Sequence, residues 1–195
     1  MDRLSFLSFL GAVLLGIGLA GCATTGPNPA SEAPILSKHS VLLELPFEPQ
    51  KVANLCGVAS VEMLTRYYGK RLSDPEAASL RAEAADHKGV SGAFLKKTLE
   101  EAGYFVAVFP GTLDRSATSL YNHLDLRRPL IVMFGSGPRH YAVVTGYDPD
   151  GGLLVLLDPA RGQVAVPIQD FLKVWKEAHY FTLLATLDAE EDEKK

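Results

Sequence analysis

Cysteine is scarce in this chain, with only Cys22 and Cys56 among its 195 residues. The two are far apart, so the paired-cysteine pattern of a zinc site is absent. The sequence also has no glycine-rich phosphate loop and no internal repeat, and its formal net charge of −4 argues against nucleic acid as a partner. Between its two ends the chain is long enough for one domain with a sizeable core.

Four of the five histidines show no metal-ligand spacing toward one another, namely His39, His87, His123 and His179. Isolated histidines of this kind are more often surface or packing residues than metal ligands. We therefore expect neither a metal ion nor a cofactor.

An uncharged apolar run extends from Phe6 to Ala20 behind a positive charge at Arg3. It is shorter than the roughly 20 residues that a membrane-spanning helix needs, which favours an export signal. The run ends in Leu19-Ala20-Gly21-Cys22, which resembles the lipobox of bacterial lipoproteins. The resemblance implies that the signal is cut before Cys22 and that this cysteine is lipidated. A transmembrane anchor and an ordinary cleaved signal are the alternatives.

Four segments follow from composition. Residues 1–21 are expected to be the lipoprotein signal peptide, 22–38 a flexible tether rich in proline and small polar residues, 39–187 the folded domain, and 188–195 a disordered charged tail. In many Gram-negative bacteria, an acidic residue directly after the anchor cysteine signals retention in the inner membrane. Ala23 stands at that position instead, which favours the periplasmic face of the outer membrane.

Helical patterns dominate the first half of the domain, and strand patterns dominate the second. We expect helices from Cys56 to Gly69, from Asp74 to about Ala85, from Ser91 to Gly103, over Ser116–Leu126 and over Ile168–Glu177. We expect strands at Val41–Leu45, Tyr104–Phe109, Pro129–Phe134, His140–Tyr147, Leu153–Leu157, Gln163–Val166 and Tyr180–Leu187. This order predicts an α+β fold with a mostly antiparallel sheet.

Cys56 is the only free thiol if Cys22 carries a lipid. A lone thiol in an exported protein is a liability unless it is buried or used. Cys56 lies at the predicted start of an apolar helix, where the helix N-terminus favours the thiolate, and Gly57 would let a substrate backbone approach closely. The alternative is a buried core cysteine.

His140 and Asp158 supply a possible base and its orienting carboxylate. His140 follows a Gly/Pro break at the mouth of a strand, and Asp158 ends the returning strand. If the turn centres near Pro149 or Asp150, the two residues lie nearly opposite each other and share a face. A carboxylate there fixes the ring tautomer and stabilises the imidazolium. Taken singly, His140 could be a surface residue and Asp158 a turn cap.

Gln50, six residues before Cys56, is a candidate oxyanion donor. Acyl transfer needs donors aimed at the developing oxyanion, and a side-chain amide can act together with the backbone N–H of the nucleophile. The alternative is a solvated turn glutamine after Pro49.

These motifs resemble the double-glycine leader peptidases, the papain-like cysteine peptidase domains of bacteriocin-exporting ABC transporters. The likeness spans roughly Phe47 to Leu184 and is carried by Gln50-x5-Cys56-Gly57 before Tyr67-Tyr68-Gly69, by His140-Tyr-Ala-Val-Val-Thr-Gly-Tyr147, and by Asp158-Pro159 with Gly162. It implies a papain-like fold with a buried nucleophile helix. It further implies that Cys56 is the nucleophile, His140 the base, Asp158 the orienter and Gln50 the oxyanion donor.

The chain differs from those exporters because it has no ATP-binding motif and begins with a lipoprotein-like signal. We therefore expect a free-standing, lipid-anchored cysteine peptidase that cleaves an exported polypeptide, with a secretion system as a possible partner. Two alternatives stay open. One is a peptidoglycan-peptide endopeptidase of the NlpC type, which more often places a second histidine where Asp158 stands. The other is a non-catalytic peptide-binding module.

Overall fold

The structure is a computed structural model that describes residues 35–135 and 139–187. The expected signal peptide, most of the expected tether and the expected charged tail lie outside the described residues. The helices are α1 (Cys56–Tyr67), α2 (Asp74–Asp86), α3 (Gly92–Glu101), α4 (Leu120–Asp125) and α5 (Ile168–Lys176). The strands are β1 (Val41–Leu42), β2 (Phe105–Pro110), β3 (Leu130–Phe134), β4 (His140–Asp148), β5 (Leu153–Asp158), β6 (Gly162–Pro167) and β7 (Phe181–Thr186).

The strands form one seven-stranded sheet in the order β2-β7-β3-β4-β5-β6, with β1 paired to the far end of β4. All of these strand pairings are antiparallel. The expected α+β class with a mostly antiparallel sheet is confirmed.

Hydroxyl residues set the start of several helices. Ser73 and Glu76 form a capping box at the start of α2, and the Ser91 hydroxyl accepts a hydrogen bond from the N–H of Phe94 at the start of α3. The same chemistry shortens the helix expected over Ser116–Leu126. Ser119 is its N-cap and accepts from the N–H of Tyr121, so α4 begins only at Leu120.

The first strand is also shorter than expected, since β1 ends at Leu42 rather than Leu45. The N–H of Leu43 donates to the carbonyl of Thr145 at 2.8 Å, where β4 departs from regular pairing, and the ladder ends there. A Cβ on Gly146 would lie 2.3 Å from the Val41 carbonyl oxygen, so β1 can approach this closely only against glycine.

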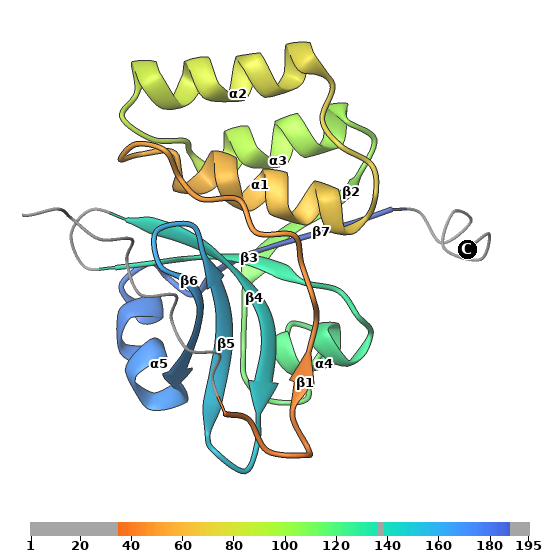
Figure 1. Ribbon diagram of the computed structural model, residues 1–195, viewed down its shortest axis with the longest axis vertical. Coiled ribbons are helices and arrows are strands. Elements are labelled where there is room, and N and C mark those ends of the chain that lie inside the picture. Colours follow the sequence, from red (N-terminus) through yellow and green to blue (C-terminus); the bar gives the residue numbers. More distant parts are fainter. Residues whose placement is uncertain (1–34, 136–138, 188–195) are drawn as a thin grey trace, which may run out of the picture. The chain divides into compact units, whose positions relative to one another are not determined.

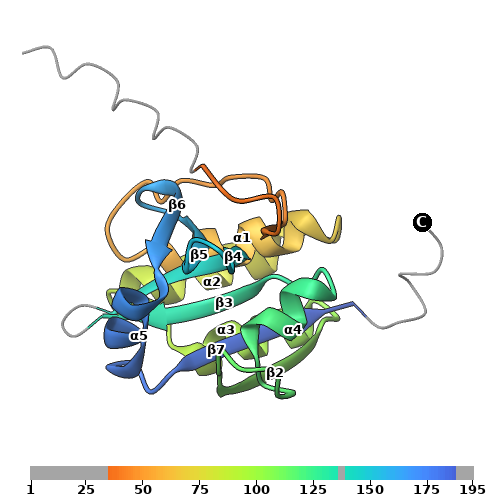
Figure 2. The same ribbon diagram turned by 90° about the horizontal axis from the view of Figure 1, so that it is seen from below.

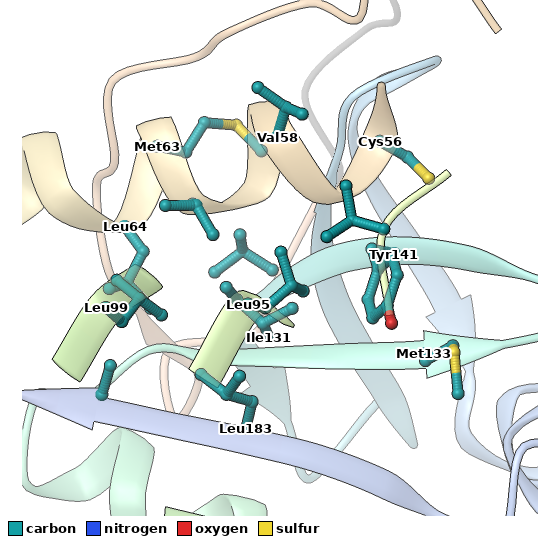
Figure 3. Close-up of a cluster of buried hydrophobic side chains, with 14 of the residues drawn as sticks. Cys56, Val58, Met63, Leu64, Leu95, Leu99, Ile131, Met133, Tyr141 and Leu183 are labelled. Atoms are coloured by element: carbon teal, nitrogen blue, oxygen red, sulfur yellow. The ribbon is translucent and has the colours of Figure 1, made fainter. Parts of the chain in front are cut away.

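Alternate residues of the sheet bury two separate hydrophobic clusters. Ile131 and Met133 face the cluster shared with α1, α2 and α3, whereas Leu130 and Val132 face the one shared with α4 and α5. Figure 1 shows α1, α2 and α3 together on one side of the sheet, and Figure 2 shows α4 and α5 on the other. Cys56 lies at one end of the first cluster, next to Tyr141 (Figure 3).

Candidate active site

The first residue of α1 is Cys56, which is 8% exposed and is the only free cysteine among the described residues. The helix is capped by Leu55, which supplies no side-chain hydrogen bond, and its first turn has no acidic residue. The N–H groups at this end are therefore not occupied by a side-chain cap, and their partial positive charge favours an anion at Cys56.

Gly57 has a role different from the one expected. A Cβ at this position would lie 3.2 Å from the Tyr141 ring and 3.6 Å from Leu95. Gly57 is buried against β4 and α3 and does not line the cleft described below. It lets α1 pack closely on the sheet, and this contact places Cys56 beside β4.

The surroundings of the Cys56 sulfur favour its ionised form. Burial raises the pKa of the thiol, but hydrogen bonds from the His140 ring and from the backbone N–H groups of Tyr141 and Gly57 outweigh burial. The pKa of Cys56 therefore lies below its ordinary value, which favours the nucleophilic thiolate.

His140 connects the sulfur to a buried carboxylate. Its Nε2 lies 2.8 Å from Oδ1 of Asp158, which leaves Nδ1 for the Cys56 sulfur. The Phe134 ring supports the imidazole edge-on at a centroid distance of 5.4 Å. Burial lowers the pKa of His140, but the contacts with Asp158 and Cys56 raise it more, to about 9. At neutral pH the ring is an imidazolium with a proton to give.

Asp158 is 1% exposed and receives three hydrogen bonds. Besides His140, the N–H of Ala160 donates to Oδ1 and Nε of Arg161 donates to Oδ2, each at 2.8 Å. Burial alone raises the pKa of the Asp158 carboxyl, but the three hydrogen-bond donors outweigh burial and lower the pKa to about 2. The Ala160 contact closes the turn after β5, so Asp158 is a turn cap and a partner of His140 at once.

A β-bulge aligns His140 with Asp158. Near the hairpin turn Asp148 pairs with Leu153, but beyond the irregularity at Thr145 the register shifts by one, so that Val143 pairs with Leu157. If the pairing near the turn continued without a bulge, Asp158 would lie opposite Val143, on the face of the sheet away from His140. The shifted register places it opposite Ala142, on the face of His140. No motif in the sequence indicates this bulge.

Gln50 is attached to the same turn as Asp158. Its backbone N–H donates to the carbonyl of Pro159 at 2.9 Å. Its side-chain Oε1 is buried and has no hydrogen-bond partner among the described residues. The amide is therefore not committed to another described group.

An open cleft of about 640 Å³ brings the site together. Its lining includes Gln50, Cys56 and His140, with Met133 and Tyr141 from the sheet, and Glu83, His87, Lys88 and the 89–92 loop from α2 to α3. Within residues 35–135 and 139–187, no three His, Cys, Asp or Glu side chains form a group able to hold a metal ion. None of the helices in those ranges has the length and apolarity to span a membrane.

A family model described as "Peptidase_C39 like family" matches residues 42–182. The chain belongs to the C39-like peptidase family. The match covers the whole cleft and all four candidate site residues.

A curated relative of this C39-like peptidase is the lactococcin-G-processing and transport ATP-binding protein LagD of Lactococcus lactis subsp. lactis. The two are 28% identical over 120 residues, which is 62% of this chain but only 16% of that protein. The chain thus matches about one sixth of the relative's length.

Solved structures share the fold. A C39-like peptidase from Bacillus anthracis superposes with a TM-score of 0.59 at 17% identity, covering 75% of this chain and 97% of that one. A double-glycine-motif protease from an AMS/PCAT transporter, solved with its leader peptide, gives 0.58 at 21% identity, covering 74% and 92%. The peptidase domain of Streptococcus ComA gives 0.57 at 20% identity, covering 73% and 98%. The papain-like peptidase fold is therefore confirmed, and the protein is a cysteine peptidase by family.

The C39-like peptidase brings all four expected site residues into one neighbourhood. Gln50, Cys56 and His140 line the cleft, and Asp158 lies behind His140. Sequence reasoning missed Arg161, the second cation on Asp158. The sequence signal for this contact is a basic residue three positions after Asp158, on the other side of a turn.

Proposed function

We propose that the protein is a lipid-anchored cysteine peptidase that cleaves an exported polypeptide. Cys56 is the nucleophile, His140 the general base and acid, Asp158 the orienting carboxylate and Gln50 an oxyanion donor. The observation that carries this proposal is the continuous set of contacts from the Cys56 sulfur through the His140 ring to Asp158, beside an open cleft.

The first half of the reaction forms a thioester. The Cys56 thiolate attacks the scissile carbonyl carbon, and the oxyanion accepts hydrogen bonds from the Cys56 N–H and the Gln50 side-chain amide. His140 then gives its proton to the leaving amine as the C–N bond breaks. Asp158 keeps the ring aligned while its charge changes.

The second half regenerates the enzyme. Neutral His140 takes a proton from water, which attacks the thioester carbonyl and releases a carboxylic acid. The thiolate and the imidazolium are restored together. The same oxyanion donors serve both steps, so a loss at Gln50 slows each of them.

Anchoring rests on the sequence ahead of the domain. The lipobox-like Leu19-Ala20-Gly21-Cys22 and the expected tether over residues 22–38 would hold the cleft near the periplasmic face of the outer membrane. The substrate is then a polypeptide that has crossed the inner membrane. A secretion or envelope-maturation system is the kind of partner that supplies it.

The test compares the N-termini of exported polypeptides in a wild-type strain and a Cys56→Ala strain. We expect at least one polypeptide to keep an uncleaved leader only in the Cys56→Ala strain and to be cut by the purified wild-type protein. His179→Gln is the matched control because His179 is exposed and does not line the cleft. Identical N-termini in the two strains, together with release of peptides from purified cell wall, would instead support the NlpC-type activity.

A further inference from the structure

We infer that Arg161 is a positioning residue of the active site, one that holds Asp158 in the orientation that His140 requires. The inference rests on the function proposed above, because it assumes that the ring orientation of His140 matters for thiol chemistry. Arg161 contributes through Asp158 and not through contact with substrate.

The three hydrogen bonds to Asp158 are divided between its two oxygens. His140 and the Ala160 N–H share Oδ1, and Arg161 is the partner of Oδ2. A carboxylate held at one oxygen can still rotate about its Cβ–Cγ bond, since this torsion has a broad energy well. Arg161 holds the second oxygen and so fixes the plane of the carboxylate. This plane determines where Oδ1 points.

The local backbone makes this contact independent of distant elements. Asp158 pairs with Gly162 across the turn between β5 and β6, and the N–H of Arg161 donates to the Asp158 carbonyl at 3.1 Å. Gly162 adopts a φ of 81°, a conformation that favours glycine and closes the turn. The Arg161 side chain then folds back onto the carboxylate from three residues away.

Arg161 lies outside the cleft. Its side chain is 54% exposed and does not belong to the cleft lining. A residue in that place binds no substrate in the cleft, so its loss should lower kcat and leave KM nearly unchanged. The half-exposed position also means that the fold does not depend on burial of this side chain.

Two roles for Arg161 shift the titration of His140 in opposite directions. If Arg161 positions Asp158, its removal weakens the Asp158–His140 contact and lowers the pKa of the ring. If Arg161 acts only as a nearby positive charge, its removal raises that pKa. Cys56 on α1 and the chain neighbours Arg139 and Tyr141 also lie close to the ring, and Glu83, His87 and Lys88 line the same cleft from the other side; none of these groups changes in the variants below.

The experiment follows the His140 ring proton by NMR against pH in the full chain, with the resonance assigned by its absence in His140→Ala. For Arg161→Gln we expect the titration midpoint to fall by on the order of one pH unit. Turnover of a polypeptide substrate should fall by up to about 10²-fold, as for other misaligned catalytic groups. Arg161→Lys should recover part of both, because an ammonium can reach Oδ2 without the planar guanidinium geometry.

Arg71→Gln is the matched control, since Arg71 is an exposed arginine in a separate hollow between α1 and α2. An unchanged or raised midpoint in Arg161→Gln would overturn the positioning role. If Arg161→Gln fails to fold by circular dichroism, the Arg161→Lys midpoint decides by the same criterion. Repeating the titration in a Cys56→Ala background separates the two ideas, because the Arg161 effect on Asp158 persists there even if Cys56 is not the nucleophile.

Discussion

At the scale of single residues, the site consists of two partners that each stabilise the charged form of the other. The pKa of Cys56 is lowered and that of His140 is raised to about 9, with burial opposing the charge on both. Thiolate and imidazolium therefore coexist over a pH range whose upper end is set by His140. Asp158, with its pKa near 2, stays ionised throughout that range.

Alkylation of Cys56 by iodoacetamide is expected to be rapid well below the roughly 8.5 at which a free thiol ionises. Peptidase activity should decline as the pH rises through about 9, because His140 then loses the proton that we propose it gives to the leaving amine. The measurements are rate against pH for both reactions. His140→Ala should return alkylation to ordinary thiol behaviour, and a thiol that reacts only after denaturation would contradict the nucleophile assignment.

Substitution of Asp158 and Gln50 should separate alignment from oxyanion stabilisation. Asp158→Asn removes a charge-assisted hydrogen bond worth about 1.5–3 kcal/mol, so turnover should fall roughly 10–100-fold and the pKa of His140 should drop. Gln50→Ala should lower turnover by about 10²–10³-fold, with alkylation of Cys56 nearly unchanged. Steady-state kinetics and alkylation rates check both variants. If Gln50→Ala turns over substrate at the wild-type rate, Gln50 is a turn residue and not an oxyanion donor.

At the scale of elements, the sequence predicted each helix and strand but not the details that align the site. Ser73-Asp74-Pro75-Glu76 and Ser91 predicted their helix starts correctly because capping depends on neighbouring residues. The bulge at Thr145 could not be predicted, since it depends on how β4 meets β1 and β5 at once. Arg161 was missed for a related reason, because its contact exists only once the turn after β5 has closed.

Deletion of Val143 tests whether the register set by the bulge is needed for the site. With one residue fewer between the bulge and His140, the ring should move to the face of the sheet away from Asp158, and Cys56 should alkylate like an ordinary thiol. Deletion of Thr145 is the matched control, because it removes the unpaired bulge residue and leaves the register between His140 and Asp158 unchanged. Circular dichroism monitors folding in both. Normal thiol activation in a folded Val143 deletion would exclude this role of the register.

At the scale of the whole molecule, the domain and its proposed anchor are expected to be separable. Cys22→Ser should release the protein from membranes and leave its unfolding midpoint unchanged, since residues 35–38, the described part of the expected tether, include no core residue of the domain. Membrane fractionation and thermal unfolding of the two proteins check this. A Cys22→Ser protein that stays in the membrane fraction would show that something other than lipidation holds it there.

The segment that leads from the expected tether into the domain is fastened before it reaches the site. Ser37 donates to Asp148 from its backbone N–H at 2.8 Å and from its hydroxyl at 2.6 Å, and β1 then pairs with β4. Tension on the chain before Ser37 therefore acts first on these hydrogen bonds. It does not act first on the 46–55 loop that carries Gln50. The sheet takes up such tension, so the alignment of Cys56 with its partners is mechanically insulated from whatever holds the N-terminus.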